Sequence, residues 1–320
     1  MRPGMSVLLL LALACGKASA DAVRARGRAH LVQGRYDLAI KALDSAIAMK
    51  PDDADAYIIR GNAYAAKHDM DGAIQSYGSA IALRPNQSFA YRNRGISYTA
   101  KGELDRAIKD LDRAIALQPG QSSTFSSRGY AYQLKGDYER ALQDYGRSID
   151  LSPGSAAVLR NRANVHFILG HFADATRDYE RALSYYQAET GPTEPLSEMG
   201  GYGVIWLRLA KMREGQADAE QFTANAARVD STTWPSRIVA FSMGKLTAEQ
   251  LIALADSGEA SRRGDQRCGA ELFIAETALS KNQAAEARKR FEATLSACTT
   301  RDVERAVAEA ELRRLGVGRK

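Results

Sequence analysis

Four prolines, Pro51, Pro85, Pro119 and Pro153, follow one another at a constant interval of 34 residues. A constant interval on this scale is the signature of a chain built from repeated supersecondary units. Proline lacks a backbone N–H and restricts the residue before it, so each proline is expected to end a helix. The spacing therefore predicts a stack of helical units, each of which packs mainly against its neighbours.

Other positions keep the same step and explain how one unit would pack. A small residue recurs where two helices of a hairpin approach closely, an alanine recurs where the second helix meets the first, and a large residue fills the space between them. In chain order these three sets are Gly27, Gly61, Gly95, Gly129 and Ala163; Ala39, Ala73, Ala107, Ala141 and Ala175; and Leu43, Tyr77, Leu111, Tyr145 and Tyr179.

Turn and capping residues separate the predicted helices. Glycine tolerates the left-handed conformation that ends many helices, which places turns at Gly34, Gly102, Gly136 and Gly170. Short polar side chains accept hydrogen bonds from the first backbone N–H groups of a helix. We therefore expect the helix that follows each proline to be capped by Asp53, Ser88, Ser122 and Ser155.

Over residues 21–187 this pattern resembles the tetratricopeptide-repeat (TPR) family, with five consecutive repeats. The resemblance implies an all-α fold, an α-solenoid in which helix hairpins form a right-handed superhelix. It also implies a concave groove lined mainly by the first helix of each repeat. The family's ligand-facing positions fall here on Arg24, Arg28, Asn62, Arg92, Asn93, Tyr130, Arg160, Asn161 and Asn164. Such a polar, basic strip suits an extended or acidic peptide, and the alternative is a solvated face with the partner bound elsewhere.

The repeat breaks after Leu183, and residues 188–267 are expected to form a divergent helical region. Residues 268–320 then predict a degenerate TPR hairpin and a final helix that covers the last open face. Several elements here are similar to the C-terminal part of NlpI-like bacterial periplasmic TPR proteins: Trp206-Leu207-Arg208, Trp234-Pro235, Met243-Gly244-Lys245, Cys268, Phe273, Phe291, Cys298 and Leu312-Arg313-Arg314-Leu315. That resemblance implies an adaptor that holds peptidoglycan-cutting enzymes, proteases or envelope assemblies together.

Cys268 and Cys298 fall at the start and the end of the degenerate hairpin. Its helices run antiparallel, so these ends come together and a disulfide is feasible; two buried free thiols are the alternative. The bridge would close a loop of about 30 residues and contribute about 3 kcal/mol in the chain-entropy model.

Residues 1–20 resemble a cleavable secretory signal. Arg2 gives a positive start, an apolar run follows, and Ala18-Ser19-Ala20 offers the small residues that a signal peptidase reads. The run is too short to span a bilayer, so we expect no membrane span. A second interpretation takes Leu13-Ala14-Cys15 as a lipobox, with a lipid anchor at Cys15. Either route implies an oxidising compartment, most simply a periplasm.

The rest of the sequence does not indicate a nucleic-acid-binding, metal-binding or catalytic site. The formal net charge is +6, but basic and acidic residues are interspersed, which argues against nucleic acid as a partner. His30 and His166 occupy a position that is tyrosine in other repeats, and His68 and His171 lie at turns. None belongs to a known ligand motif, so we expect no metal, no cofactor and no catalytic residue. The acids Asp110, Asp144 and Asp178 share one repeat position and are expected to pair with the recurrent arginines.

The sequence thus favours a periplasmic scaffold that binds other envelope proteins and is not an enzyme. Two alternatives stay open. One is a structural role in self-assembly, including a homodimer. The other is an enzyme whose site lies within residues 188–267, where the repeat does not explain Trp206, Trp234, Arg208 and Arg237.

Overall fold

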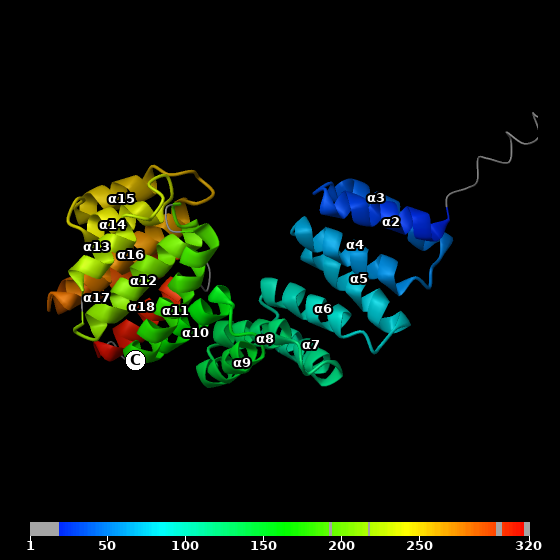
Figure 1. Ribbon diagram of the computed structural model, residues 1–320, viewed down its shortest axis with the longest axis horizontal. Helices are drawn as coiled ribbons and strands as arrows, with labels where there is room; N and C mark the ends of the chain where they lie inside the picture. The colour runs from blue at the N-terminus through cyan, green and yellow to red at the C-terminus, as the bar shows by residue number, and fades with distance from the viewer. Residues whose placement is uncertain (1–18, 192–193, 217, 299–302, 317–320) are drawn as a thin grey trace, which may run out of the picture. The chain divides into compact units, whose positions relative to one another are not determined.

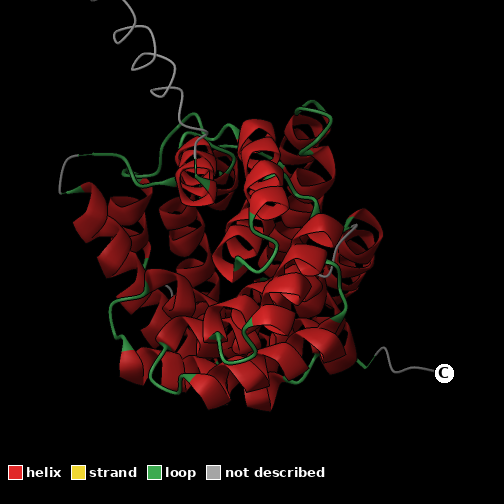
Figure 2. Cartoon of the chain, turned by 90° about the vertical axis from the view of Figure 1, so that its right-hand side faces the viewer, coloured by secondary structure: helices red, strands yellow, loops and turns green. Residues whose placement is uncertain are grey.

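A computed structural model describes residues 19–191, 194–216, 218–298 and 303–316. Almost all of the predicted leader, including Cys15, lies outside these ranges. Within them the chain forms 17 helices and one isolated β-bridge between Leu196 and Val229. Figure 2 shows the helices and the loops that connect them. The prediction of an all-α fold is confirmed. None of the helices described is both long enough and apolar enough to cross a membrane.

Successive helices pack as hairpins, and the chain divides into two compact units, one up to Ser127 and one from Arg128. This boundary falls within α8, inside the predicted five-repeat array. The five hairpins are coloured blue to green in Figure 1 and have these bounds: α2 (Ala20–Val32) and α3 (Tyr36–Met49), α4 (Ala54–Ala66) and α5 (Met70–Leu83), α6 (Ser88–Ala100) and α7 (Leu104–Leu117), α8 (Ser122–Lys135) and α9 (Tyr138–Leu151), α10 (Ala156–Leu169) and α11 (Phe172–Thr190).

The repeated small and large residues pack inside each hairpin as predicted. All five repeated alanines of the second helices are fully buried, and so are the large residues opposite the glycines. A Cβ atom on Gly61 would lie 2.6 Å from Cε1 of Tyr77, so a side chain at that position would displace the buried ring. The glycine therefore sets how closely the helices of this hairpin approach.

The turns follow the prediction, but two predicted caps are wrong. The glycines Gly34, Gly102, Gly136 and Gly170 have positive φ values of 70–83°. Asp53 and Ser155 cap α4 and α10 through their side chains. Ser88 and Ser122 are instead the first residues of α6 and α8.

The cap register explains this error, because the positions one repeat apart from Asp53 and Ser155 are Gln87 and Gln121. Gln87 is the N-cap residue of α6 and makes no side-chain cap hydrogen bond. Ser88, one residue later, donates its hydroxyl to Oε1 of Gln118.

Beyond the repeats, seven further helices belong to the second unit: α12 (Glu198–Arg213), α13 (Ala219–Ala226), α14 (Pro235–Ser242), α15 (Ala248–Asp256), α16 (Arg263–Ser280), α17 (Ala284–Ala297) and α18 (Val303–Arg314). Helices α16 and α17 form the predicted degenerate hairpin, in which Ala287 and Phe291 are fully buried. Helix α18 packs on both of these helices and also on α10. Arg314 fixes the contact with α10, because its Nη2 donates to the carbonyl of Ile168 at 2.6 Å.

An aromatic cluster joins the last repeat to this C-terminal region. The indole of Trp206 on α12 is 2% exposed and lies 5.4 Å from the ring of Phe167 and 5.6 Å from that of Phe273. Its centroid is also 6.4 Å from that of Tyr179. Trp206 therefore packs between repeat 5 and the C-terminal helices.

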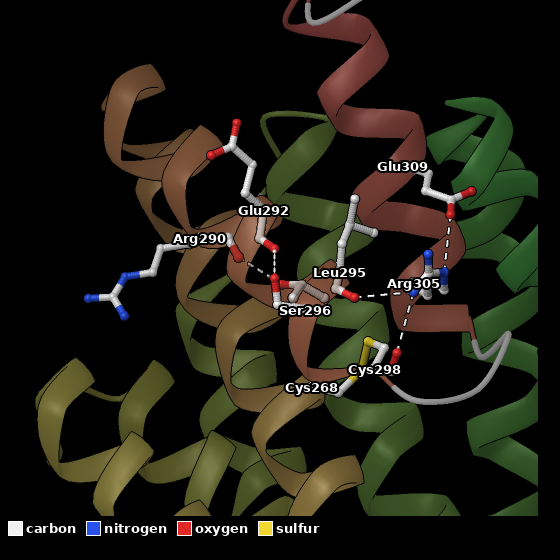
Figure 3. Close-up of a disulfide and its surroundings, with 9 residues drawn as sticks. Cys268, Arg290, Glu292, Leu295, Ser296, Cys298, Arg305 and Glu309 are labelled. Carbon is white, nitrogen blue, oxygen red and sulfur yellow. Dashed lines mark hydrogen bonds and ion pairs between the residues drawn. A yellow bond between two sulfur atoms is a disulfide. The ribbon is translucent and has the colours of Figure 1, made fainter. Parts of the chain in front are cut away.

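Cys268 on α16 and Cys298 at the C-cap of α17 are joined by a disulfide, with their Cα atoms 4.9 Å apart (Figure 3). Both residues are buried. Arg305 of α18 donates to the carbonyl of Cys298 at 3.3 Å and to that of Leu295 at 3.1 Å. The antiparallel hairpin thus brings the two helix ends together.

Candidate functional site

The recurrent arginines and acids stabilise the repeats and are not free to bind a ligand. The guanidinium of Arg162 donates through Nε and Nη2 to the two carboxylate oxygens of Asp178, at 2.6 and 2.8 Å. Arg94 and Asp110 form the same bidentate pair within the hairpin of α6 and α7. Arg128 and Asp144 form it within the hairpin of α8 and α9. The acids of these pairs are buried. The predicted pairing is confirmed.

In the first unit the predicted groove residues differ in whether their side chains are paired within the fold. Arg24 forms an ion pair with the buried carboxylate of Asp53 and a second with Asp21 at 3.0 Å. Its charge is therefore balanced inside the structure. Arg28, one helical turn further on, is exposed.

Asn62, Asn93 and Arg92 form a hydrogen-bonded row across the second and third repeats. The hydroxyl of Tyr77 and Nδ2 of Asn93 both donate to Oδ1 of Asn62, at 2.7 and 3.1 Å. Arg92 donates to Oγ of Ser123 at 3.0 Å and has no ion pair with any acid in the described part of the chain. Burial lowers the pKa of its guanidinium. Arg92 therefore offers an uncompensated positive charge.

In the second unit the four remaining predicted residues line one pocket. Tyr130 of α8 and Arg160, Asn161 and Asn164 of α10 surround a volume of about 280 Å³. Sequence reasoning missed the other side of this pocket, which comes from α8, α12 and α18 and consists of Gln133, Leu134, Met199, Tyr202, Trp206, Val303 and Glu304.

The polar floor of the pocket is held in place by buried tyrosines. The hydroxyl of Tyr179, which is fully buried, donates to Oδ1 of Asn164 at 2.7 Å. The hydroxyl of Tyr145 donates to Oε1 of Gln133 at 2.8 Å. Desolvation raises the pKa of Tyr179 well above its usual value, so this hydroxyl stays a donor. The amide of Asn164 is thus oriented by the core of the repeat.

Arg160 carries the positive charge of this pocket, whose lining also includes the acid Glu304 of α18. Arg160 makes no ion pair with an acid among the residues described. Its Nη1 lies 2.6 Å from Sδ of Met199, and its Nη2 lies 3.5 Å from Oδ1 of Asn161. Both contacts are weak partners for a cation, because a thioether is a poor acceptor and the second distance is long. The guanidinium is therefore available to an external carboxylate.

Exposed apolar side chains stand beside this charge. Tyr130 is 43% exposed and Met199 is 41% exposed. Methionine and tyrosine are well suited to contact a partner, because one adapts its shape and the other combines an apolar ring with a hydroxyl. The pocket can therefore hold a carboxylate together with an apolar side chain. The signal that sequence reasoning lacked was the fold of α12 and α18 onto repeat 5.

A larger pocket, of about 640 Å³, lies among α12 and α14–α17, in the region of the enzyme alternative. Of the four residues singled out there, Arg208 lines it, and its guanidinium stacks 4.1 Å from the ring centroid of Phe222. The lining has no histidine or cysteine, and its Glu286 and Arg290 pair with each other at 2.7 Å.

Comparisons with solved structures place the fold among helical repeat proteins. A tetratricopeptide repeat protein from Parabacteroides merdae ATCC 43184 is 14% identical, with a TM-score of 0.55 over 92% of this chain and 100% of that chain. The pilF structure from Pseudomonas aeruginosa is 16% identical, with a TM-score of 0.57 over 71% of this chain and 96% of that chain. MamA from Desulfovibrio magneticus RS-1 is 17% identical, with a TM-score of 0.51 over 54% and 97%. At these identities the similarity concerns the fold alone.

No curated protein sequence matches the chain. Two sequence models described as tetratricopeptide repeat do match it, one over residues 24–88 and 127–195 and the other over residues 88–121. Together they run almost without interruption through the five hairpins, so the chain belongs to the tetratricopeptide-repeat family.

Proposed function

We propose that this protein is an exported scaffold that holds a segment of another envelope protein in the pocket formed by Tyr130, Arg160, Asn161 and Asn164. Proteins of the tetratricopeptide-repeat family generally mediate protein–protein interactions and are typically not enzymes. The observation that carries the proposal is the position of Arg160, a guanidinium that forms no ion pair within the described ranges and lies in a pocket beside the exposed side chains of Tyr130 and Met199.

The chemistry of the pocket defines the segment that it would bind. A guanidinium presents a planar fork of N–H donors that matches a carboxylate. Asn161 adds a side-chain amide, which can both donate to and accept from a peptide backbone. Tyr130 and Met199 offer apolar surface next to these groups. The segment we propose therefore carries a carboxylate, from an acidic side chain or a chain terminus, beside an apolar residue.

Export is proposed on separate grounds. The leader-like pattern of residues 1–20 and the pairing geometry of Cys268 and Cys298 both suit an oxidising compartment. A lipid anchor at Cys15 remains the alternative to a soluble exported form. Docking of peptidoglycan enzymes or proteases is the more specific form of the proposal, and it rests on the NlpI-like elements of the C-terminal region.

The test is site-specific photo-crosslinking in the native envelope, with a photoreactive amino acid in place of Tyr130. We expect a discrete crosslinked partner, identified by mass spectrometry, that is lost when Arg160→Glu is added. The matched control is Arg147→Glu, an equal charge reversal at an exposed arginine of α9 that does not line the pocket. Crosslinks that persist in Arg160→Glu, or that Arg147→Glu removes equally, would overturn the assignment of this pocket.

A further inference from the structure

At the turn between α10 and α11, three side chains with metal-binding atoms lie together: His166, His171 and Asp174. One ligand atom from each lies within 4.8 Å of the others. His166 is in the last turn of α10, His171 is the N-cap residue of α11, and Asp174 is in the first turn of α11. No metal is expected here from the sequence, because this spacing across a turn matches no known ligand motif.

The backbone that brings the two histidines together is shared by the other repeats. The N–H of His171 donates to the carbonyl of His166 at 2.9 Å, and Gly170 between them adopts φ 83°. One repeat earlier, the N–H of Asp137 donates to the carbonyl of Tyr132 at the same distance, and Gly136 also has φ 83°. The scaffold of the turn is therefore constant, and only its side chains differ.

The other repeats show what these three positions ordinarily do. In repeat 4 they hold Tyr132, Asp137 and Arg140, and Arg140 pairs with Asp137 while its guanidinium lies 4.7 Å from the ring centroid of Tyr132.

Repeat 3 has the same arrangement, with Arg106 paired to Glu103 at 2.6 Å and placed over the ring of Tyr98. Repeat 5 replaces the aromatic ring, the acid and the arginine by histidine, histidine and aspartate. All three changes introduce residues that bind transition metals.

We propose that His166, His171 and Asp174 form a binding site for a divalent transition metal of the zinc type. Two imidazoles and one carboxylate are a typical ligand set for such ions, whereas Mg²⁺ and Ca²⁺ prefer oxygen ligands throughout. Because His171 is exposed, the remaining coordination positions face solvent.

The geometry requires only a small closure. Zinc–ligand bonds of about 2.0–2.1 Å in a tetrahedron separate the ligand atoms by about 3.4 Å. The ligand atoms now lie within 4.8 Å of one another, so binding of zinc requires side-chain rotations that bring them closer together. The rings of the two histidines already lie with centroids 5.9 Å apart.

The charges around the cluster permit a cation. Arg162, the nearest cation on α10, is balanced by its bidentate pair with Asp178. Arg177 pairs with Oδ1 of Asp174 at 2.9 Å but is 69% exposed, so solvent screens it, and the second carboxylate oxygen can face the metal.

The test is a calorimetric titration of the full chain, purified without a histidine tag, with ZnCl₂. We expect one zinc ion per chain and a rise in Tm. His171→Ala is expected to weaken binding by at least about 10-fold, because even groups that only orient a ligand are worth that much. MgCl₂ and CaCl₂ are expected to give no binding heat at this site.

A triple variant tests the site without disturbing the fold. His166→Tyr with His171→Asp and Asp174→Arg installs the residues of repeat 4, whose ion pair suits this turn, and it should abolish zinc binding. The control is His68→Asn, at the exposed histidine of the repeat 2 turn, where φ is 62° and asparagine is tolerated. The control should bind zinc normally. No binding by wild type, or equal binding by the triple variant, would overturn the proposal.

Discussion

Removal of the carboxylate of Asp178 tests whether the repeated arginine–aspartate pairs hold the hairpins together. Asp178 is 2% exposed on α11 and accepts two hydrogen bonds from Arg162 of α10. The pKa of Arg162 is raised, mainly by the hydrogen bond to Asp178, so the pair favours the charged guanidinium. Asp178→Ala would leave a half-buried guanidinium without its partner.

The expected loss in the free energy of unfolding is about 3 kcal/mol. Removing one member of a buried pair costs about 3–5 kcal/mol, because the other charge stays buried and uncompensated. The lower end applies here, since the side chain of Arg162 is 23% exposed and Asp150 and Asp174 also act on its charge. Repeat 2 shows this kind of compensation naturally. There Ser76 stands in place of the aspartate, and Arg60 pairs with Asp44 at 2.8 Å.

The measurement is urea unfolding followed by tryptophan fluorescence, since Trp206 lies 6.4 Å from the ring of Tyr179 in the same unit. A helical repeat chain need not unfold in two states, so midpoints are compared between variants. The double variant Arg162→Met with Asp178→Leu removes both charges and is expected to differ from wild type by less than about 1 kcal/mol. A loss below about 0.5 kcal/mol for Asp178→Ala, or a double variant as unstable as the single one, would refute the reasoning.

Two further predictions concern the C-terminal helices. The double variant Cys268→Ser with Cys298→Ser should lower the free energy of unfolding by about 3 kcal/mol. The cysteines of native wild-type protein should resist alkylation until the protein is reduced. Free thiols in protein purified from the envelope would contradict the pairing. Burial raises the pKa of Glu276 to about 7, so this residue binds a proton in the folded state over a range where the unfolded chain has lost it. The stabilisation from protonated Glu276 is complete below pH 4.5 and is lost as the pH rises towards 7, which lowers the free energy of unfolding by at most about 3 kcal/mol. Glu276→Gln should remove this pH dependence from urea midpoints measured between pH 4.5 and 8. An unchanged slope would mean that the Arg213–Glu276 pair at 3.1 Å keeps the carboxylate ionised.

The hairpins could be predicted from the sequence because the residues that pack within each repeat lie close together in the chain. Small, aromatic and turn residues recur at fixed positions, and the structure uses them as the period indicates. The errors at Ser88 and Ser122 have the same origin, since Gln87 and Gln121 occupy the cap register and glutamine is a weak signal for a cap. The period thus located the helix start to within one residue but misassigned the capping side chain.

The second wall of the candidate pocket could not be predicted in this way. Met199 and Tyr202 belong to α12 and Glu304 to α18, where no repeat relates sequence to position. The hydrogen bond from Arg314 to Ile168 joins residues 146 apart in the chain. Contacts at such a distance leave no local pattern. The histidine cluster was missed for a related reason, because its ligands are joined by a turn whose geometry only the structure supplies.

The repeat register also explains why some groove arginines are free and others are not. Arg24, Arg92 and Arg160 hold the same position in repeats 1, 3 and 5. Arg24 pairs with Asp53, the residue that caps the first helix of the next repeat. The residue equivalent to Asp53 for Arg92 is Gln121, which has no charge, so Arg92 bonds to Ser123 instead.

For Arg160 the corresponding residue is Glu189, but α11 continues to Thr190 and no helix cap forms at that position. The acid therefore lies exposed on the helix, and Arg160 has no ion pair with it or with another acid in the described ranges. Whether a groove arginine can bind a partner thus depends on the residue that begins the next repeat. An aspartate at that position neutralises the charge of the arginine within the fold. Where the position holds a neutral residue or the array ends, the charge of the arginine can interact with a ligand.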